Sequence, residues 1–167
     1  MTKGISHYAV LLICFVIELI FSSCNSVNTF PMIYFSVPNK IVKTGIDSIY
    51  SKNPAFKIPL KWRDLDDWSK RGLGFLDRRI FYFQSSPEEM YYITFAHYKG
   101  ENTQTCSLGI MAVNQGGRWF EYTDLTDSEK IRIEERFERE IVSKLQAYTH
   151  NKAIVRPSYG APLDHVK

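Results

Sequence analysis

The chain of 167 residues contains little that points to a chemical activity. It has only three cysteines and nine glycines, and it lacks a Gly-rich phosphate loop, a Gly-x-Ser-x-Gly elbow, a His-Glu-x-x-His sequence and a Cys-x-x-Cys pair. Its net charge of +3 is small and scattered along the chain, which argues against nucleic-acid binding. The sequence therefore gives no support for an enzyme, and we expect no cofactor, no metal and no nucleic-acid partner.

One N-terminal segment departs from the globular composition of the rest. An apolar run extends from Tyr8 to Phe21, after a start that carries Lys3 and before Ser22, Ser23 and Cys24. This order of charge, apolar run and small residues is typical of a secretory signal. The run is shorter than the roughly 20 residues that a spanning helix needs. Cleavage is therefore expected, and an uncleaved signal anchor is the alternative.

The residues Phe21-Ser22-Ser23-Cys24 resemble the lipobox of bacterial lipoproteins, although Phe21 stands where a smaller aliphatic residue is usual. The resemblance covers the leader alone. It implies that Cys24 becomes the mature N-terminus and carries a lipid, which would tether the protein to a membrane of the bacterial cell envelope. It does not distinguish the inner membrane from the outer one.

The cysteines fit this interpretation. Cys14 would leave with the leader and Cys24 would carry the lipid, so that Cys106 remains as a single thiol. The competing interpretation is a disulfide between Cys24 and Cys106 in an unlipidated exported protein. We divide the chain into a signal peptide (1–23), a tether (24–30), one domain (31–156) and a flexible tail (157–167).

The first part of that domain is the least regular in pattern. A strand is expected within 30–37 and a short helix or turn near Gly45 to Tyr50. Within 61–72 a helix is predicted, with Asp64 as its N-cap and Gly72 as the left-handed residue at its end.

Residues 79–122 predict an antiparallel meander of four strands. The runs 79–84, 91–98, 105–113 and 118–122 are rich in aromatic and β-branched residues and are separated by turn residues. Pairing Phe83 with Tyr91, and Ile93 with Ile110, places the apolar side chains on one face. That predicted core face consists of Phe81, Phe83, Tyr91, Ile93, Phe95, Leu108, Ile110 and Ala112.

A long amphipathic helix is predicted to follow. Thr126 and Glu129 have the spacing of a capping box, and apolar residues recur at helical spacing up to Tyr148. The predicted buried positions are Ile133, Phe137, Ile141, Leu145 and Tyr148. The expected fold class is α+β: a four-stranded antiparallel sheet packed against this C-terminal helix, with an irregular N-terminal segment and an edge strand at 153–155.

Two sets of residues are candidates for a site. The sheet face opposite the predicted core carries Tyr82, Tyr92, Tyr98 and Met111, and aromatic rings with polar tips suit binding. The alternative is that the N-terminal segment covers that face with its apolar residues, which are Ile33, Phe35, Phe56, Trp62 and Trp68.

His97 and Cys106 are predicted cross-strand neighbours and resemble a nucleophile with its base. They lie on the apolar face without a third orienting group, so we predict no catalytic residue. The expected function is a non-catalytic binding or structural module that its lipid tethers to the membrane, where an envelope protein is a candidate partner. An inhibitor or immunity-type protein and a small periplasmic enzyme are the alternatives.

Overall fold

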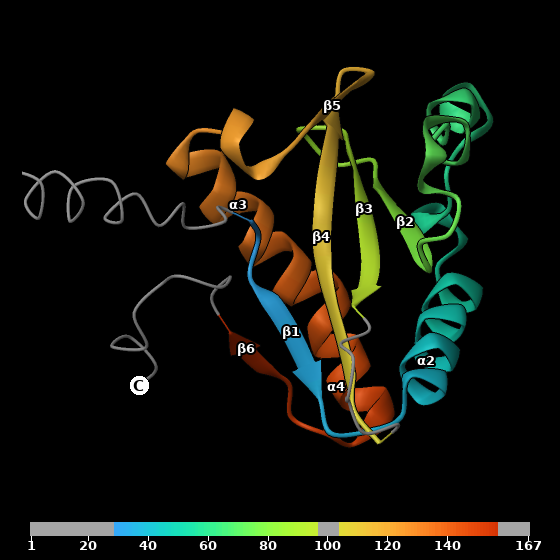
Figure 1. The fold of residues 1–167 in the computed structure, drawn as a ribbon, viewed down its shortest axis with the longest axis vertical. Helices are drawn as coiled ribbons and strands as arrows, with labels where there is room; N and C mark the ends of the chain where they lie inside the picture. The colour runs from blue at the N-terminus through green and yellow to red at the C-terminus, as the bar shows by residue number, and fades with distance from the viewer. Residues whose placement is uncertain (1–28, 97–103, 157–167) are drawn as a thin grey trace, which may run out of the picture.

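The structure is a computed structural model that describes residues 29–96 and 104–156. Cys24, His97 and Tyr98 lie outside these ranges. The described chain forms one antiparallel sheet with the strand order β2-β3-β4-β1-β6, and β5 pairs with β4 (Figure 1). The strands are β1 (Met32–Phe35), β2 (Arg78–Phe83), β3 (Glu89–Ala96), β4 (Cys106–Gln115), β5 (Arg118–Phe120) and β6 (Ile154–Arg156).

Helices cover one face of this sheet. The helical segments are α2 (Asn39–Lys52), α3 (Asp127–Phe137), the π turn η5 (Glu138–Val142) and α4 (Ser143–Thr149), and the shorter turns are η1 (Pro54–Phe56), η2 (Leu60–Leu65), η3 (Ser69–Leu73) and η4 (Tyr122–Asp124). Figure 1 shows α3 and α4 following one another across the sheet behind β1 and β4. Within the two described ranges, none of these helices combines the length and the apolar character needed to cross a membrane.

The predicted meander is present, but the sheet is larger than four strands. The meander β2-β3-β4-β5 is joined by β1, which pairs antiparallel with both β4 and β6. Ile33 and Phe35 of β1 alternate toward the core and are 5% and 1% exposed. The expected strand in 30–37 and the expected edge strand at 153–155 therefore belong to the same sheet. Phe30, which we placed in the tether, is also buried.

The strand registers show one prediction that holds and one that fails. Ile93 faces Ile110, as predicted. Tyr91 faces Phe81 and not Phe83, so the β2–β3 register is shifted by two positions. Because strand side chains alternate with a period of two, this shift leaves every residue of the hairpin on its predicted face.

A β-bulge in β4 was not predicted. Tyr92 faces Ala112 whereas Ile93 faces Ile110, so Met111 is the extra residue between them. The bulge moves Ala112 to the face opposite the predicted core, where it packs with Tyr92. The assignment of Ala112 to the main core was therefore wrong.

The C-terminal helix begins as predicted. The backbone N–H of Glu129 donates to Oγ1 of Thr126 at 3.4 Å, and the backbone N–H of Thr126 donates to a carboxylate oxygen of Glu129 at 2.9 Å. The helical run continues over 127–149, but η5 interrupts the α-helical pattern. Ile133 to Leu145 supply four buried apolar positions as expected, whereas Tyr148 is 40% exposed.

Helix α2 is longer than the short helix or turn predicted near Gly45. Its buried residues Val42, Ile46 and Ile49 recur every three or four positions and pack into the main core. Gly45 permits close packing against α4, since a Cβ at this position would lie 2.9 Å from Cδ1 of Tyr148 and 3.0 Å from Cδ2 of Leu145.

The segment 54–76 begins at the main core, which contains Phe56, and continues onto the opposite face of the sheet, where its residues 58–73 contribute to a second core. Trp68 packs against Tyr92 with a ring separation of 4.3 Å, and Trp119 lies 5.3 Å from Trp68. The predicted helix of 61–72 is replaced by short turns. Asp64 lies inside η2 and does not cap a helix, so that prediction was wrong. Gly72 has the predicted left-handed conformation, with φ of 81°.

Candidate functional site

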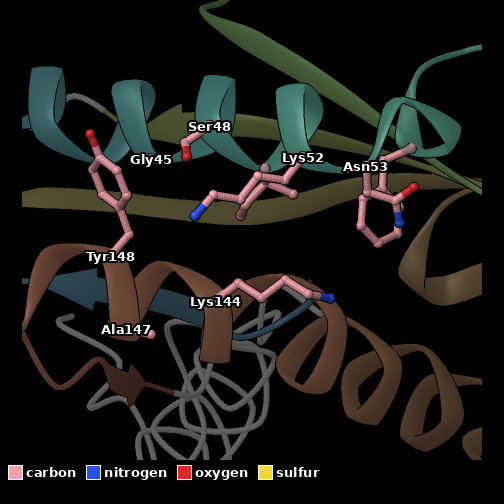
Figure 2. Close-up of a pocket in the computed structure, with 9 residues that line it drawn as sticks. Gly45, Ser48, Lys52, Asn53, Lys144, Ala147 and Tyr148 are labelled. Carbon is pink, nitrogen blue, oxygen red and sulfur yellow. The ribbon is translucent and has the colours of Figure 1, made fainter.

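An apolar groove lies between α2 and α4. We call it the α2–α4 groove. Its volume is about 370 Å³, within the range of small-molecule sites. Figure 2 shows its lining side chains between the two helices. They are Gly45, Ser48, Ile49, Lys52, Asn53, Phe56, Lys144, Ala147 and Tyr148.

The groove is lined by small and large residues of the two helices. Ile49 and Phe56 close it on the side of the main core. Tyr148 forms one end, where its ring approaches Gly45 closely but remains 40% exposed to solvent. The walls are therefore apolar and open to solvent at one side.

Two lysines project into the gap between the helices, as Figure 2 shows. The ammonium group of Lys144 donates to Oε2 of Glu140 at 3.0 Å and lies 5.1 Å from the ring centre of Phe56. Lys52 is in the last turn of α2, and within 29–96 and 104–156 it has no ion-pair partner. An anionic group could therefore reach a cation that no carboxylate of the described chain neutralises.

The charged residues that line the groove are both cations, Lys52 and Lys144, and none of its lining residues is a carboxylate. Outside the lining, Lys144 and Arg139 pair with Glu140, and their hydrogen bonds hold the pKa of the Glu140 carboxyl below its usual range. A groove with apolar walls and cations at its edge can hold an apolar chain that ends in a carboxylate or a phosphate.

The structure does not bring the predicted tyrosine face together as an open surface. Tyr82 and Tyr92 are 7% and 0% exposed, because the second core covers them. Met111 is 36% exposed at the bulge. Tyr98 and the lipidation candidate Cys24 lie outside the described residues. The alternative considered above is confirmed for Trp62 and Trp68, which cover this face, whereas Ile33, Phe35 and Phe56 pack into the main core on the other side of the sheet.

The other sequence candidates show no reactive arrangement. Cys106 is buried, and its thiol donates to Oδ1 of Asn39 at 3.5 Å, while its predicted neighbour His97 is not described. No group of three or more His, Cys, Asp or Glu residues suited to a metal occurs in the part of the chain that the structure describes.

A buried charged cluster around Glu89 is structural. Its carboxylate accepts hydrogen bonds from Arg132, Arg136, Tyr91 and Gln115. The side chain of Glu89 is 0% exposed. Because side chains of four residues of the protein already donate hydrogen bonds to this carboxylate, it is not available to bind a ligand.

The residues of the groove escaped the sequence analysis. Lys52 and Lys144 look like ordinary surface lysines until α2 and α4 are known to be neighbours. One signal existed: Tyr148 closes the apolar series of the C-terminal helix but lies at the groove rather than in the core.

Comparisons with protein families, curated proteins and solved structures give no match for this chain.

Proposed function

We propose that this chain is a lipoprotein of the bacterial cell envelope, anchored through a lipid on Cys24, whose folded domain is a non-catalytic module that binds an anionic amphiphile in the α2–α4 groove. The observation that carries the choice of ligand is the position of the Lys52 and Lys144 ammonium groups over apolar walls. A fatty acid or another single-chain lipid with an anionic head has the matching chemistry.

The leader supports the anchor. An apolar run followed by Ser22, Ser23 and Cys24 has the layout of a lipoprotein signal. Each buried methylene of an attached acyl chain contributes about 0.8 kcal/mol, and two or more chains give stable attachment. A domain anchored in this way needs no apolar surface for membrane attachment, so an apolar groove is free for another ligand.

The groove supports the ligand. An acyl chain lying along Ile49 and Ala147 would lose its contact with water, which favours binding by about 25 cal/mol for each Å² of apolar surface buried. Its head group would accept a charge-assisted hydrogen bond from Lys52, which no carboxylate of the described residues neutralises, and Lys144 adds positive charge farther along the groove. A cationic head would meet an excess of like charge at the same place.

The anchor is tested by labelling cells with a radioactive fatty acid. Label on the wild-type chain that disappears in the Cys24→Ser variant, together with release of that variant from the membrane fraction, would agree with the proposal. An unlabelled wild-type chain, or a Cys24→Ser variant that stays with membranes as before, would contradict it.

The groove is tested with a palmitate analogue that carries a photoreactive diazirine near the end of its chain. The probe is added to membranes that contain the full chain, illuminated, and located by peptide mapping. We expect light-dependent label within residues 44–52 and 145–152, which supply Gly45, Ile49, Ala147 and Tyr148. The corresponding amine, with the same chain and the opposite head charge, should label these segments weakly.

Matched lysine variants separate the groove from general attraction to a basic protein. Lys52→Gln should lower the labelling by about tenfold. Lys70→Gln removes the same charge from the exposed side of the segment 54–76 and should leave it unchanged. Equal labelling of both variants, or equal labelling by the acid and the amine, would overturn the assignment of the ligand. The proposal that a lipid on Cys24 anchors the chain would not be affected by that result.

A further inference from the structure

The outer edge of the sheet carries a second site, made by β6. This strand is the last in the sheet order, and it pairs with β1 through Ile33 opposite Val155. Ile154 and Val155 are large apolar residues that remain 50% and 46% exposed. A short edge strand with exposed apolar side chains is a template for pairing with another extended segment.

A pocket of about 540 Å³ opens beside this edge, between β1, β6 and the C-terminal helix. We call it the edge pocket. It shares no lining residue with the α2–α4 groove. Its walls are formed by Phe30, Pro31, Ile33, Ile110, Glu134, Glu135, Phe137, Glu138, Arg139, Ser143 and Val155.

The face of the sheet that the pocket occupies follows from the strand register. Val155 and its partner Ile33 are on the same face and both line the pocket, whereas Ile154 pairs with Tyr34 and is on the other face. A strand added beyond β6 would therefore place every second side chain on the pocket side. The residue opposite Val155 would lie over the pocket, and the residues two positions before and after it would share its face.

The helical wall of the pocket is acidic. Glu134, Glu135 and Glu138 line it against the single cation Arg139. Burial raises the pKa of the carboxyls of Glu134 and Glu138, and Lys130 offsets this only in part at Glu134. Three carboxylates therefore face one cation in the lining of this pocket, and Glu134 is the one that is half-buried.

The π turn η5 shapes this wall. Oγ of Ser143 donates to the backbone carbonyl of Glu138 at 2.6 Å, five positions earlier in the chain. Glu138 and Ser143 both line the pocket, although five positions correspond to more than one turn of a regular α-helix. Single π turns inside α-helices are frequent at functional sites.

We infer that β6 receives an extended segment of a partner protein as a further strand, with an apolar side chain of that segment in the edge pocket and flanking lysines or arginines at Glu134, Glu135 and Glu138. Main-chain hydrogen bonds would supply affinity, and the pocket would select the side chain. Charge complementarity identifies the occupant, since a basic flank supplies the cations that the glutamates lack.

The probe for this site is the peptide TKTLTKT with blocked ends. In an extended conformation its leucine and both lysines lie on one face, as the edge pocket requires. One control is TETLTET, which reverses the charge, and another is TKTLTKT with N-methyl groups on alternate amides, which keeps the side chains but prevents strand pairing. Binding is measured by calorimetry with the full chain in nanodiscs of zwitterionic lipid.

We expect saturable binding of TKTLTKT, with affinity at least about tenfold weaker for either control peptide. The Glu134→Gln/Glu138→Gln double variant should bind TKTLTKT about tenfold more weakly, whereas Asp64→Asn, an exposed carboxylate outside the pocket, should bind it like the wild type. Equal affinity for the N-methylated peptide would exclude strand addition. Unchanged affinity of the double variant for TKTLTKT would show that the glutamates of the acidic wall take no part in binding the peptide.

Two other occupants give distinct results in the same samples. If a second copy of the chain occupies the edge, the free protein will sediment as a dimer that Val155→Asp dissociates. If another segment of the same chain occupies it, the β6 amides that do not pair with β1 will already be protected from hydrogen exchange before peptide is added. Either result would overturn the assignment to a partner protein. These two results would say nothing about the α2–α4 groove or about lipid attachment to Cys24, so a failure of this inference is distinguishable from a failure of the proposed function.

Discussion

Arg132 holds both oxygens of the Glu89 carboxylate. Its Nη1 donates to Oε2 at 2.8 Å and its Nη2 donates to Oε1 at 2.6 Å. Nη1 of Arg136 donates to Oε2 at 2.9 Å. This bidentate pair connects the C-terminal helix to β3, so the position of that helix on the sheet depends on one buried carboxylate.

Removing that carboxylate should be strongly destabilising. We expect Glu89→Gln to lower the free energy of unfolding by roughly 3–5 kcal/mol, because Arg136 would be left as an unpaired charge at 7% exposure. Arg139→Gln breaks a surface pair with Glu140 and should change the stability by less than about 0.5 kcal/mol. Chemical denaturation of the two variants measures the difference. A Glu89→Gln variant as stable as Arg139→Gln would contradict a structural role for the cluster.

The two tyrosines of the second core should respond in opposite ways to loss of their hydroxyl groups. Within the described ranges the buried Tyr92 hydroxyl has no hydrogen-bond partner, whereas the Tyr82 hydroxyl donates to Glu88. Tyr92→Phe should therefore leave stability unchanged or raise it, since it removes a polar group that costs about 1–3 kcal/mol to bury unpaired. Tyr82→Phe should lower stability. Thermal melts of both variants, compared with the wild type, measure the two effects, and a fall in both would show that Tyr92 has a partner.

The glutamates of the edge pocket should make stability depend on pH. Burial raises the folded-state pKa of Glu134 and Glu138 above the ordinary value of 4.5. Folding therefore favours the protonated form. This contribution is fully present below the unfolded pKa and is lost as pH rises through the folded pKa.

At neutral pH the Glu134→Gln/Glu138→Gln variant should accordingly be more stable than the wild type, and the advantage should vanish as the pH falls below 4.5. Denaturant titrations at several pH values measure the difference in the free energy of unfolding between this variant and the wild type. Glu129 provides the reference, because its hydrogen bonds with Thr126 lower its pKa. A Glu129→Gln variant should therefore be less stable than the wild type at neutral pH, and this difference should disappear as the pH falls. A stability difference that is constant with pH would mean that the pocket carboxyls are well hydrated.

Gly45 should resist substitution even by alanine. A methyl group there would be within 3.0 Å of α4, and overpacking of this kind costs about 1–3 kcal/mol. The gain in helix propensity of about 0.5–1 kcal/mol offsets only part of that cost. We expect a net loss of stability in Gly45→Ala, partial recovery in Gly45→Ala/Tyr148→Ala, and a change of less than about 0.5 kcal/mol in the neighbouring Thr44→Ala. A Gly45→Ala protein more stable than the wild type would show that the helices can separate freely.

Much of the fold could be predicted from local signals in the sequence. The capping box at Thr126 fixed the start of the C-terminal helix, and aromatic runs separated by turn residues identified the hairpin. The faces of that hairpin were right although its register was not, because an error of two positions preserves the alternation of side chains. Such features depend on neighbours in the sequence.

Features that depend on distant segments were missed. Nothing local marks Met111 as a bulge, since its position follows from how β3 and β4 fit together, and the face of Ala112 was therefore wrong. The side chains of β5 divide between the two cores for the same reason: Phe120 packs against the main core and Trp119 against the second.

The candidate sites could not be predicted for the same reason. The α2–α4 groove joins residues from both ends of the domain, and the edge pocket joins β1 and β6 to the middle of the C-terminal helix. The tyrosine pattern of β2 and β3 was real, but whether such a face is open depends on what packs over it. Here Trp62 and Trp68 do so.

The placement of β1 between β4 and β6 also governs the order in which the domain can form during synthesis. The first strand to leave the ribosome has both of its sheet neighbours later in the chain, at 106–108 and 154–156. Pairings across such long separations are slow, because loop closure must precede the contacts that repay it. The nascent chain must therefore hold β1 unpaired until residues 106–108 have emerged, and must hold the side of β1 that faces β6 unpaired until residues 154–156 have emerged.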